Sequence, residues 1–214
     1  MPVAINKRLA RKVLSIVDQG LCGGMGVQEP GKMCVEAAVC YALGEPHSDQ
    51  PSCVAPEVRS FKIKLNDSNW SSNEARAKGL RRIAIAQLGT KEPPFDALEF
   101  SKRVTFLAVT KWTPKALRSA AKIAISEEEK QKLLAAAKKC EKLGANATLE
   151  ELKNAAANAA YAAYAAANAA NAAYDKKGSA ARDRFLAACA EDVVQVLIDL
   201  KAPGTKFLSI TEEG

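Results

Sequence analysis

The sequence predicts an all-α protein, a multi-helix bundle around one long central helix. Three observations carry this prediction. Apolar residues recur at helical spacing in most segments, helix-start signals open several of them, and residues 154–174 contain only Ala, Asn and Tyr. Because Ala has the highest helix propensity and nothing in this run breaks a helix, we expect residues 154–174 to form the central helix.

The central run has a start signal and a polar stripe. Thr148 and Glu151 form a T-x-x-E capping box ahead of it. Its Asn and Tyr residues recur every three or four positions, so they should share one face of an all-Ala helix. We expect this face to pack as a polar ladder against another helix, in the bundle or in a homo-oligomer; the alternative is a surface that stacks on a ligand. Buried Asn amides argue against a membrane span. The stripe comprises Asn158, Tyr161, Tyr164 and Asn168.

The N-terminal segments are predicted from their apolar period and glycines. Residues 5–16 have one apolar and one basic face, which is typical of an amphipathic helix. The glycines of residues 21–31 indicate a loop. Residues 33–43 then predict a short, mostly buried helix that ends at Gly44.

Two further helices are predicted between residues 56 and 89. Residues 58–65 alternate as a strand would but also fit a helix, and we favour the helix because no partner strand is visible and Pro56 suits a first turn. Ser71 and Glu74 form an S-x-x-E box, which predicts a helix from there to residue 89.

The C-terminal half predicts four helices besides the central one. Residues 95–111 and 114–125 have helical periods, and Ser126 with Glu129 is a capping box that opens a third. Residues 179–200 carry one apolar face and stop at a Pro-Gly pair. We expect one domain over residues 1–214; a subdivision into a Cys- and Gly-loop-containing unit (1–90) and an Ala-rich bundle (91–214) is the alternative.

The charge and the cysteines bound the class of protein. The net charge of +7 is concentrated in basic clusters, which suits an anionic partner and makes nucleic-acid binding one functional alternative. The first turn is basic and amphipathic with no apolar segment behind it, so no signal peptide is expected. We therefore expect a cytoplasmic protein whose six cysteines are thiols. The clusters are Lys7, Arg8, Arg11 and Lys12; Arg76, Lys78, Arg81 and Arg82; and Lys111, Lys115, Arg118 and Lys122.

The glycine-rich loop offers the first candidate site. Residues 26–32 satisfy G-x-x-x-x-G-K, a pattern whose backbone N–H groups hold phosphate ahead of a helix. A true P-loop is disfavoured because Met33 stands where a Ser or Thr should bind Mg²⁺, and no strand precedes the loop. A plain anion-binding loop remains. The predicted ligand-binding residues are Gly23, Gly24, Gly26, Gly31, Lys32, Arg81 and Arg82.

The cysteines offer a second candidate. Cys34 lies in the first turn predicted for residues 33–43, where the helix dipole would lower its pKa, and His47 lies in a loop that could fold back. A Cys34–His47 hydrolase is the catalytic alternative. A metal set of Cys22, Cys34, Cys40, His47 and Cys53 is disfavoured because it lacks a C-x₂-C pair, so we expect no metal and no cofactor.

The motifs together resemble a known group. The segments are C-G-G-M-G (22–26), P-G-K-M-C-V-E-A-A-V-C-Y-A-L-G (30–44), P-S-C-V (51–54), W-S-S-N-E-A-R-A-K-G-L-R-R-I-A-I-A-Q-L-G (70–89), A-A-Y-A-A-Y-A-A-A-N (159–168) and L-K-A-P-G (200–204). They look like alanine-rich proteins encoded by bacteriophages and mobile elements, and the Ala-rich part is also similar to families labelled immunity proteins. The resemblance implies a phage accessory or immunity-type protein in a bacterial host and brings no established activity.

The sequence therefore predicts a binding protein rather than an enzyme. The expected partner is a small anionic, nucleotide-like ligand or a host or phage protein, held at the glycine-rich loop. The hydrolase and the helical nucleic-acid binder remain as alternatives.

Overall fold

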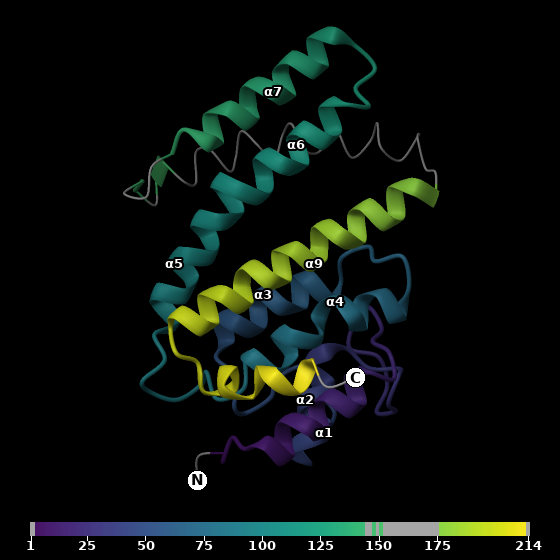
Figure 1. The fold of residues 1–214 in the computed structure, drawn as a ribbon, viewed down its shortest axis with the longest axis vertical. Coiled ribbons are helices and arrows are strands. Elements are labelled where there is room, and N and C mark those ends of the chain that lie inside the picture. Colours follow the sequence, from purple (N-terminus) through teal and green to yellow (C-terminus); the bar gives the residue numbers. More distant parts are fainter. Residues whose placement is uncertain (1–2, 144–146, 149, 152–175, 213–214) are drawn as a thin grey trace. The chain divides into compact units, whose positions relative to one another are not determined.

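The computed structural model describes residues 3–143, 147–148, 150–151 and 176–212 (Figure 1). Within these residues every regular element is a helix, and the only β pairing is an isolated bridge between Gly26 and Met33. The all-α prediction is confirmed. The α-helices are α1 (Lys7–Val17), α2 (Val35–Leu43), α3 (Pro56–Asn66), α4 (Asn73–Ala86), α5 (Ala97–Leu107), α6 (Thr113–Ala121), α7 (Glu127–Glu141) and α9 (Lys176–Asp199), with a π-helix η1 (Ala108–Trp112) and a 3₁₀ helix η2 (Pro203–Thr211).

The predicted central helix, residues 154–174 with its Asn/Tyr stripe, lies outside the described residues. Its start signal is described. The Thr148 N–H donates to the Glu151 carboxylate at 2.7 Å, and the Glu151 N–H donates to Thr148 Oγ1 at 3.2 Å. The capping box is therefore formed as predicted.

The chain divides into two compact units. Unit 1 contains residues 1–101 and 177–214, and unit 2 contains residues 102–176. The C-terminal helix α9 thus belongs with the N-terminal half of the chain. The predictions of one domain, or of a subdivision at residue 90, stay predictions.

The core of unit 1 is built from α1, α2, α4 and η2. Helix α1 packs on α2 and α4, and η2 packs along α4. Gly204 is the point of closest approach, because its N–H donates to the Leu88 carbonyl at 2.8 Å and a Cβ there would overlap the Ile85 carbonyl. A glycine is therefore required where η2 meets α4. The largest fully buried apolar side chains here include Leu21, Met33, Leu80, Ile83 and Leu88.

Unit 2 is a helical hairpin in its described part. Helices α6 and α7 pack around Leu117, Leu133 and Ala137, all nearly or fully buried. The sequence predicted two helices, 95–111 and 114–125, but the chain passes from α5 through the π-turn η1 into α6 without leaving the helical path (Figure 1). A proline in a regular α-helix clashes with the carbonyl four residues earlier, and the wider π-turn lies just ahead of Pro114.

Two local predictions need correction. Helix α4 is capped by Ser72, whose side chain accepts from the Ala75 N–H, and not by Ser71. Ser71 is bound instead by Asp183 of α9 through its N–H and its hydroxyl. The short buried helix begins at Val35 rather than Met33, with Cys34 as its N-cap. The helix predicted at residues 58–65 is confirmed as α3, with Pro56 in its first turn.

Candidate functional site

Three polar side chains hold the glycine-rich loop in place through hydrogen bonds. Asn66, at the end of α3, donates from Nδ2 to the Cys22 carbonyl at 2.9 Å and accepts from the Val35 N–H at 3.3 Å. Asp67 Oδ1 accepts from the Gly24 N–H at 2.8 Å. The buried Arg76 of α4 donates to the carbonyls of Leu21 and Asn66. These contacts make the loop a fixed part of unit 1.

Two glycines allow the loop to turn back on itself. Gly26 and Gly31 have φ of +71° and +84°, a region that other residues rarely adopt. A Cβ at Gly26 would overlap the Lys32 carbonyl oxygen and the Cys22 sulfur. Gly24 also has positive φ, but a Cβ there would meet no atom within 4 Å. Gly26 is therefore required for packing as well as for conformation.

The loop amides predicted to hold an anion donate within the protein. The Val27 N–H donates to the Lys32 carbonyl at 2.9 Å, the Lys32 N–H to the Glu29 carbonyl at 2.9 Å, and the Cys34 N–H to the Met25 carbonyl at 3.2 Å. The Lys32 ammonium pairs with the Glu29 carboxylate at 3.0 Å, with both side chains exposed. Several of the loop amides thus already have partners within the protein, and a carboxylate lies beside the lysine.

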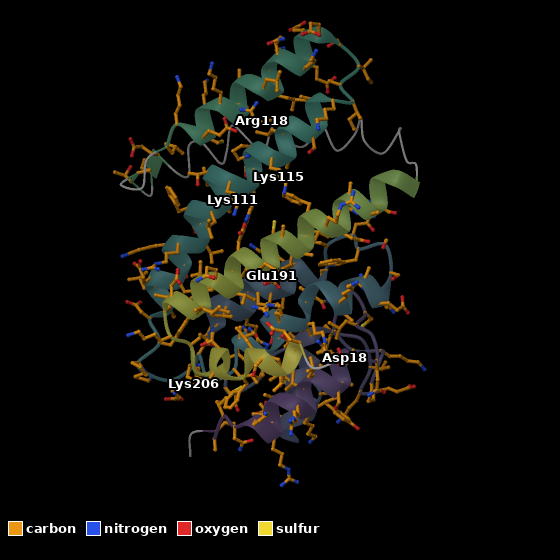
Figure 2. All side chains as sticks on the ribbon, viewed as in Figure 1. Asp18, Lys111, Lys115, Arg118, Glu191 and Lys206 are labelled. Atoms are coloured by element: carbon orange, nitrogen blue, oxygen red, sulfur yellow. The ribbon has the colours of Figure 1, made fainter. Side chains whose placement is uncertain are left out.

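Arg81 and Arg82 are not brought to the loop by any contact they make. Arg81 Nε lies 2.7 Å from Asp18 Oδ1, and this hydrogen bond raises the pKa of the guanidinium. Arg82 Nε lies 3.0 Å from Glu191 Oε2. Asp18 follows α1 and Glu191 belongs to α9, and both are labelled in Figure 2. The two arginines therefore join α4 to its neighbouring segments.

The expected activation of Cys34 is contradicted. As the N-cap of α2, its sulfur accepts from the Ala37 N–H at 3.3 Å and is only 4% exposed. Burial raises the pKa of the thiol to about 11, the opposite of the lowering expected from the helix dipole. His47 does fold back, but its Nε2 lies 3.1 Å from the Gly26 carbonyl oxygen. The two side chains thus have different partners, and the thiol is protonated at neutral pH.

The other cysteines are also thiols, as predicted. All six are free, and burial raises the pKa of Cys53 to about 11 as well. Across the described residues, no group of three or more His, Cys, Asp or Glu side chains is arranged to hold a metal ion.

A cavity of about 20 Å³ lies beneath the glycine-rich loop. Three acidic residues line it, each from a different segment: Glu36 from α2, Asp49 from the loop before α3, and Asp67 directly after α3. The Asn66 amide and the Cys34 thiol complete its polar part. Met25 lines it too and is 46% exposed, so the cavity lies next to the surface. The volume suffices for about one water-sized group.

Glu36, which lines the cavity, also belongs to a buried ion pair. Glu36 and Lys62 are both 0% exposed, and Lys62 Nζ lies 3.2 Å from Glu36 Oε1. Burial raises the pKa of Glu36 and lowers that of Lys62, while each charge opposes the shift of the other. Neither carboxylate oxygen of Glu36 has a hydrogen bond of good geometry. A buried charged pair with unfilled acceptors is costly, which marks this region for a role beyond packing.

Sequence reasoning missed Glu36, Asp49, Asp67 and Lys62. One signal was available, because Glu36 is the single charged residue in the apolar segment that forms α2. A charge inside an otherwise buried helix requires a partner, and none lies on α2 itself.

Comparisons with protein-family models, with curated proteins and with solved structures found no match to this chain. In the part of the chain that the structure describes, no helix combines the length and apolar character needed to cross a membrane. The site's own geometry therefore carries the functional argument.

Proposed function

We propose that this chain is a non-catalytic binding protein whose loop cavity receives a primary ammonium group, supplied by a lysine side chain of a protein partner. The supporting observation is that three acidic residues line one water-sized space. An ammonium has three donors and no acceptor, so it suits a site lined by acidic residues.

The acceptors in the cavity are partly unfilled. Asp67 is exposed and uses Oδ1 to accept from Gly24 and Asn66. Neither oxygen of Glu36 makes a well-aligned hydrogen bond, although Lys62 Nζ lies 3.2 Å from Oε1. Hydrogen bonds from nitrogen to oxygen span about 2.7–3.2 Å, which is longer than the 2.3–2.6 Å of a calcium ligand. An ammonium therefore tolerates a wider ring of carboxylates than a metal ion does.

The surface around the cavity favours a protein as the source of the ammonium. Met25 and Val27 at the loop tip are 46% and 55% exposed, although both are large apolar side chains. Apolar residues beside a charged pocket fit a lysine whose aliphatic stem packs outside while its charge enters. The fixed loop lowers the entropy cost of binding. This proposal keeps the protein partner expected from the sequence and from the resemblance to immunity-type proteins, and replaces the anionic ligand by a cationic group.

The test is an NMR titration of ¹⁵N-labelled protein with Nα-acetyl-lysinamide, and with Nα-acetyl-norleucinamide as the uncharged control. We expect saturable shifts of the Gly24 and Asn66 amides with the lysine compound only. Asp49→Asn and Asp67→Asn should each weaken this binding, because each replaces a carboxylate by a neutral amide of the same shape.

A matched control is available at Asp96, whose Oδ1 accepts from the Glu99 N–H at 2.9 Å as that of Asp67 accepts from Gly24. Asp96→Asn should leave the titration unchanged. Equal shifts with the norleucine compound, or full binding by the Asp49 and Asp67 variants, would remove the cavity as an ammonium site.

A further inference from the structure

The net charge of the chain resides in one segment of unit 2. Residues 102–143 contain 11 Lys and Arg against 4 Asp and Glu, a balance of +7. The whole chain has 31 against 24, so all other residues together carry 20 of each sign and sum to zero. Residues 102–126 hold six of the cations and no acid at all. Charge segregated in this way is the electrostatic footprint of a polyanion-binding surface.

The cations lie along one face of a helix. Lys111, Lys115, Arg118 and Lys122 follow at spacings of four, three and four residues through η1 and α6, and all four side chains are exposed. We call these four residues the basic stripe. Figure 2 shows its first three members in succession along this helical run. At 1.5 Å per residue the stripe is about 16 Å long.

One acid of the same segment, Glu141, is paired with the stripe. Arg118 Nη2 lies 2.6 Å from Glu141 Oε2 of α7, and this bidentate pair lowers the pKa of Glu141. Lys138, one turn before Glu141 and exposed, lowers that pKa as well, so it lies beside the pair. The remaining acids of the segment, Glu127 to Glu129, cluster in the first turn of α7, where they complement the helix dipole. Lys138 thus widens the stripe from the neighbouring helix.

The stripe suits a nucleic-acid backbone better than a lipid surface. An interfacial helix needs a free apolar face between its cations, but Leu117, the one large apolar side chain of α6, is buried with Ala121 in the core of unit 2. The exposed apolar side chains nearby, Ile123 and Ile125, lie at the turn after α6. None of the stripe residues is aromatic, so contact would be to phosphates rather than to stacked bases.

We infer that the basic stripe, with Lys138, is a sequence-independent binding surface for the phosphate backbone of duplex nucleic acid. It belongs to unit 2, whereas the loop cavity belongs to unit 1. Among the basic clusters of the sequence this one has all four side chains exposed, whereas Arg76 of the second cluster is buried.

The test measures the affinity for a fluorescent 24-base-pair duplex by anisotropy, from 50 to 200 mM NaCl. Wild-type affinity should fall with salt, with a slope of about 0.9 per phosphate contact. The triple variant Lys115→Gln, Lys122→Gln, Lys138→Gln should reduce this slope by about 2 to 3. Thermal melts confirm that each variant is folded.

The matched control removes three exposed lysines of unit 1, as Lys64→Gln, Lys78→Gln, Lys206→Gln. It has the same net charge as the test variant and should keep the wild-type slope. An equal loss of slope in both variants would show that only total charge matters and would overturn the inference. So would an absence of duplex binding at 50 mM NaCl, or binding to phosphatidylserine vesicles in place of the duplex.

Discussion

The buried ion pair gives the most quantitative prediction. Replacing Lys62 by Met keeps most of the length and packing of the side chain but leaves the Glu36 carboxylate, 0% exposed, without its countercharge. Breaking a buried pair in this way costs about 3–5 kcal/mol. The folded variant can limit the loss by taking up a proton on Glu36. That uptake costs 1.36 kcal/mol for each pH unit above the unfolded pKa, which is 4.5 for Glu.

This limit makes the effect depend on pH. Protonation of Glu36 limits the loss of unfolding free energy to about 5 kcal/mol at pH 8 and to about 1 kcal/mol at pH 5. The sign follows from the raised pKa of Glu36: the folded variant holds a proton that the unfolded chain releases above pH 4.5, so its stability falls as pH rises from there toward the folded pKa. Lys62→Met should therefore be strongly destabilised at pH 8 and close to wild type at pH 5.

The assay is urea unfolding followed by the fluorescence of Trp70, which is 5% exposed in unit 1. It is run in a Trp112→Phe background, because Trp112 belongs to unit 2 and would report on that unit. Lys64→Met, on an exposed position of the same helix, is the control and should change the free energy of unfolding by less than about 0.5 kcal/mol. A loss of under 1 kcal/mol for Lys62→Met at pH 8, or a loss independent of pH, would refute the buried, charged state of Glu36.

Three further predictions concern unit 1. Gly26→Ala should destabilise the protein far more than Gly24→Ala in urea melts, since both have positive φ but only Gly26 lacks room for a Cβ; similar losses would contradict the loop packing. Ser72→Ala should cost about 1 kcal/mol of unfolding free energy, because α4 loses its N-cap. Adding Glu74→Gln to this variant should remove no further capping energy, because Ser71 and Glu74 do not form the cap; a further loss of capping energy would restore the S-x-x-E box. A maleimide probe at pH 7 should label Cys22 before Cys34 in peptide mass spectra, because Cys34 is nearly buried with its pKa raised to about 11; faster labelling of Cys34 would revive the nucleophile hypothesis.

The predictions from sequence succeeded where the cause is local. Ser126 accepts from the Glu129 N–H at 3.1 Å, as its capping box predicts, because both partners lie within one turn. The predictions failed where a residue distant in the sequence determines the local structure. Ser71 and Ser72 are both suitable caps, and Asp183, 112 residues after Ser71, engages the first and leaves the second to cap α4.

In the candidate site, too, local features could be predicted from the sequence and features set by distant residues could not. The positive φ of Gly26 and Gly31 follows from the loop pattern. The direction of the loop amides does not, because it depends on Asn66 and Asp67, which α3 brings under the loop. The burial that raises the pKa of Cys34 and the meeting of Glu36 with Lys62 likewise arise only when α2 packs on α3.

The sign of the charge that enters the loop cavity is the central claim, and one paired titration tests it. Ethylammonium chloride and sodium ethyl phosphate are added separately to ¹⁵N-labelled protein at equal ionic strength, and the Gly24, Asn66 and Asp67 amide shifts are followed. The three acidic residues that line the cavity predict saturable shifts with the ammonium compound and none with the phosphate. Saturable shifts with ethyl phosphate alone would contradict the account and return the loop to the anion-binding role that its G-x-x-x-x-G-K pattern first indicated.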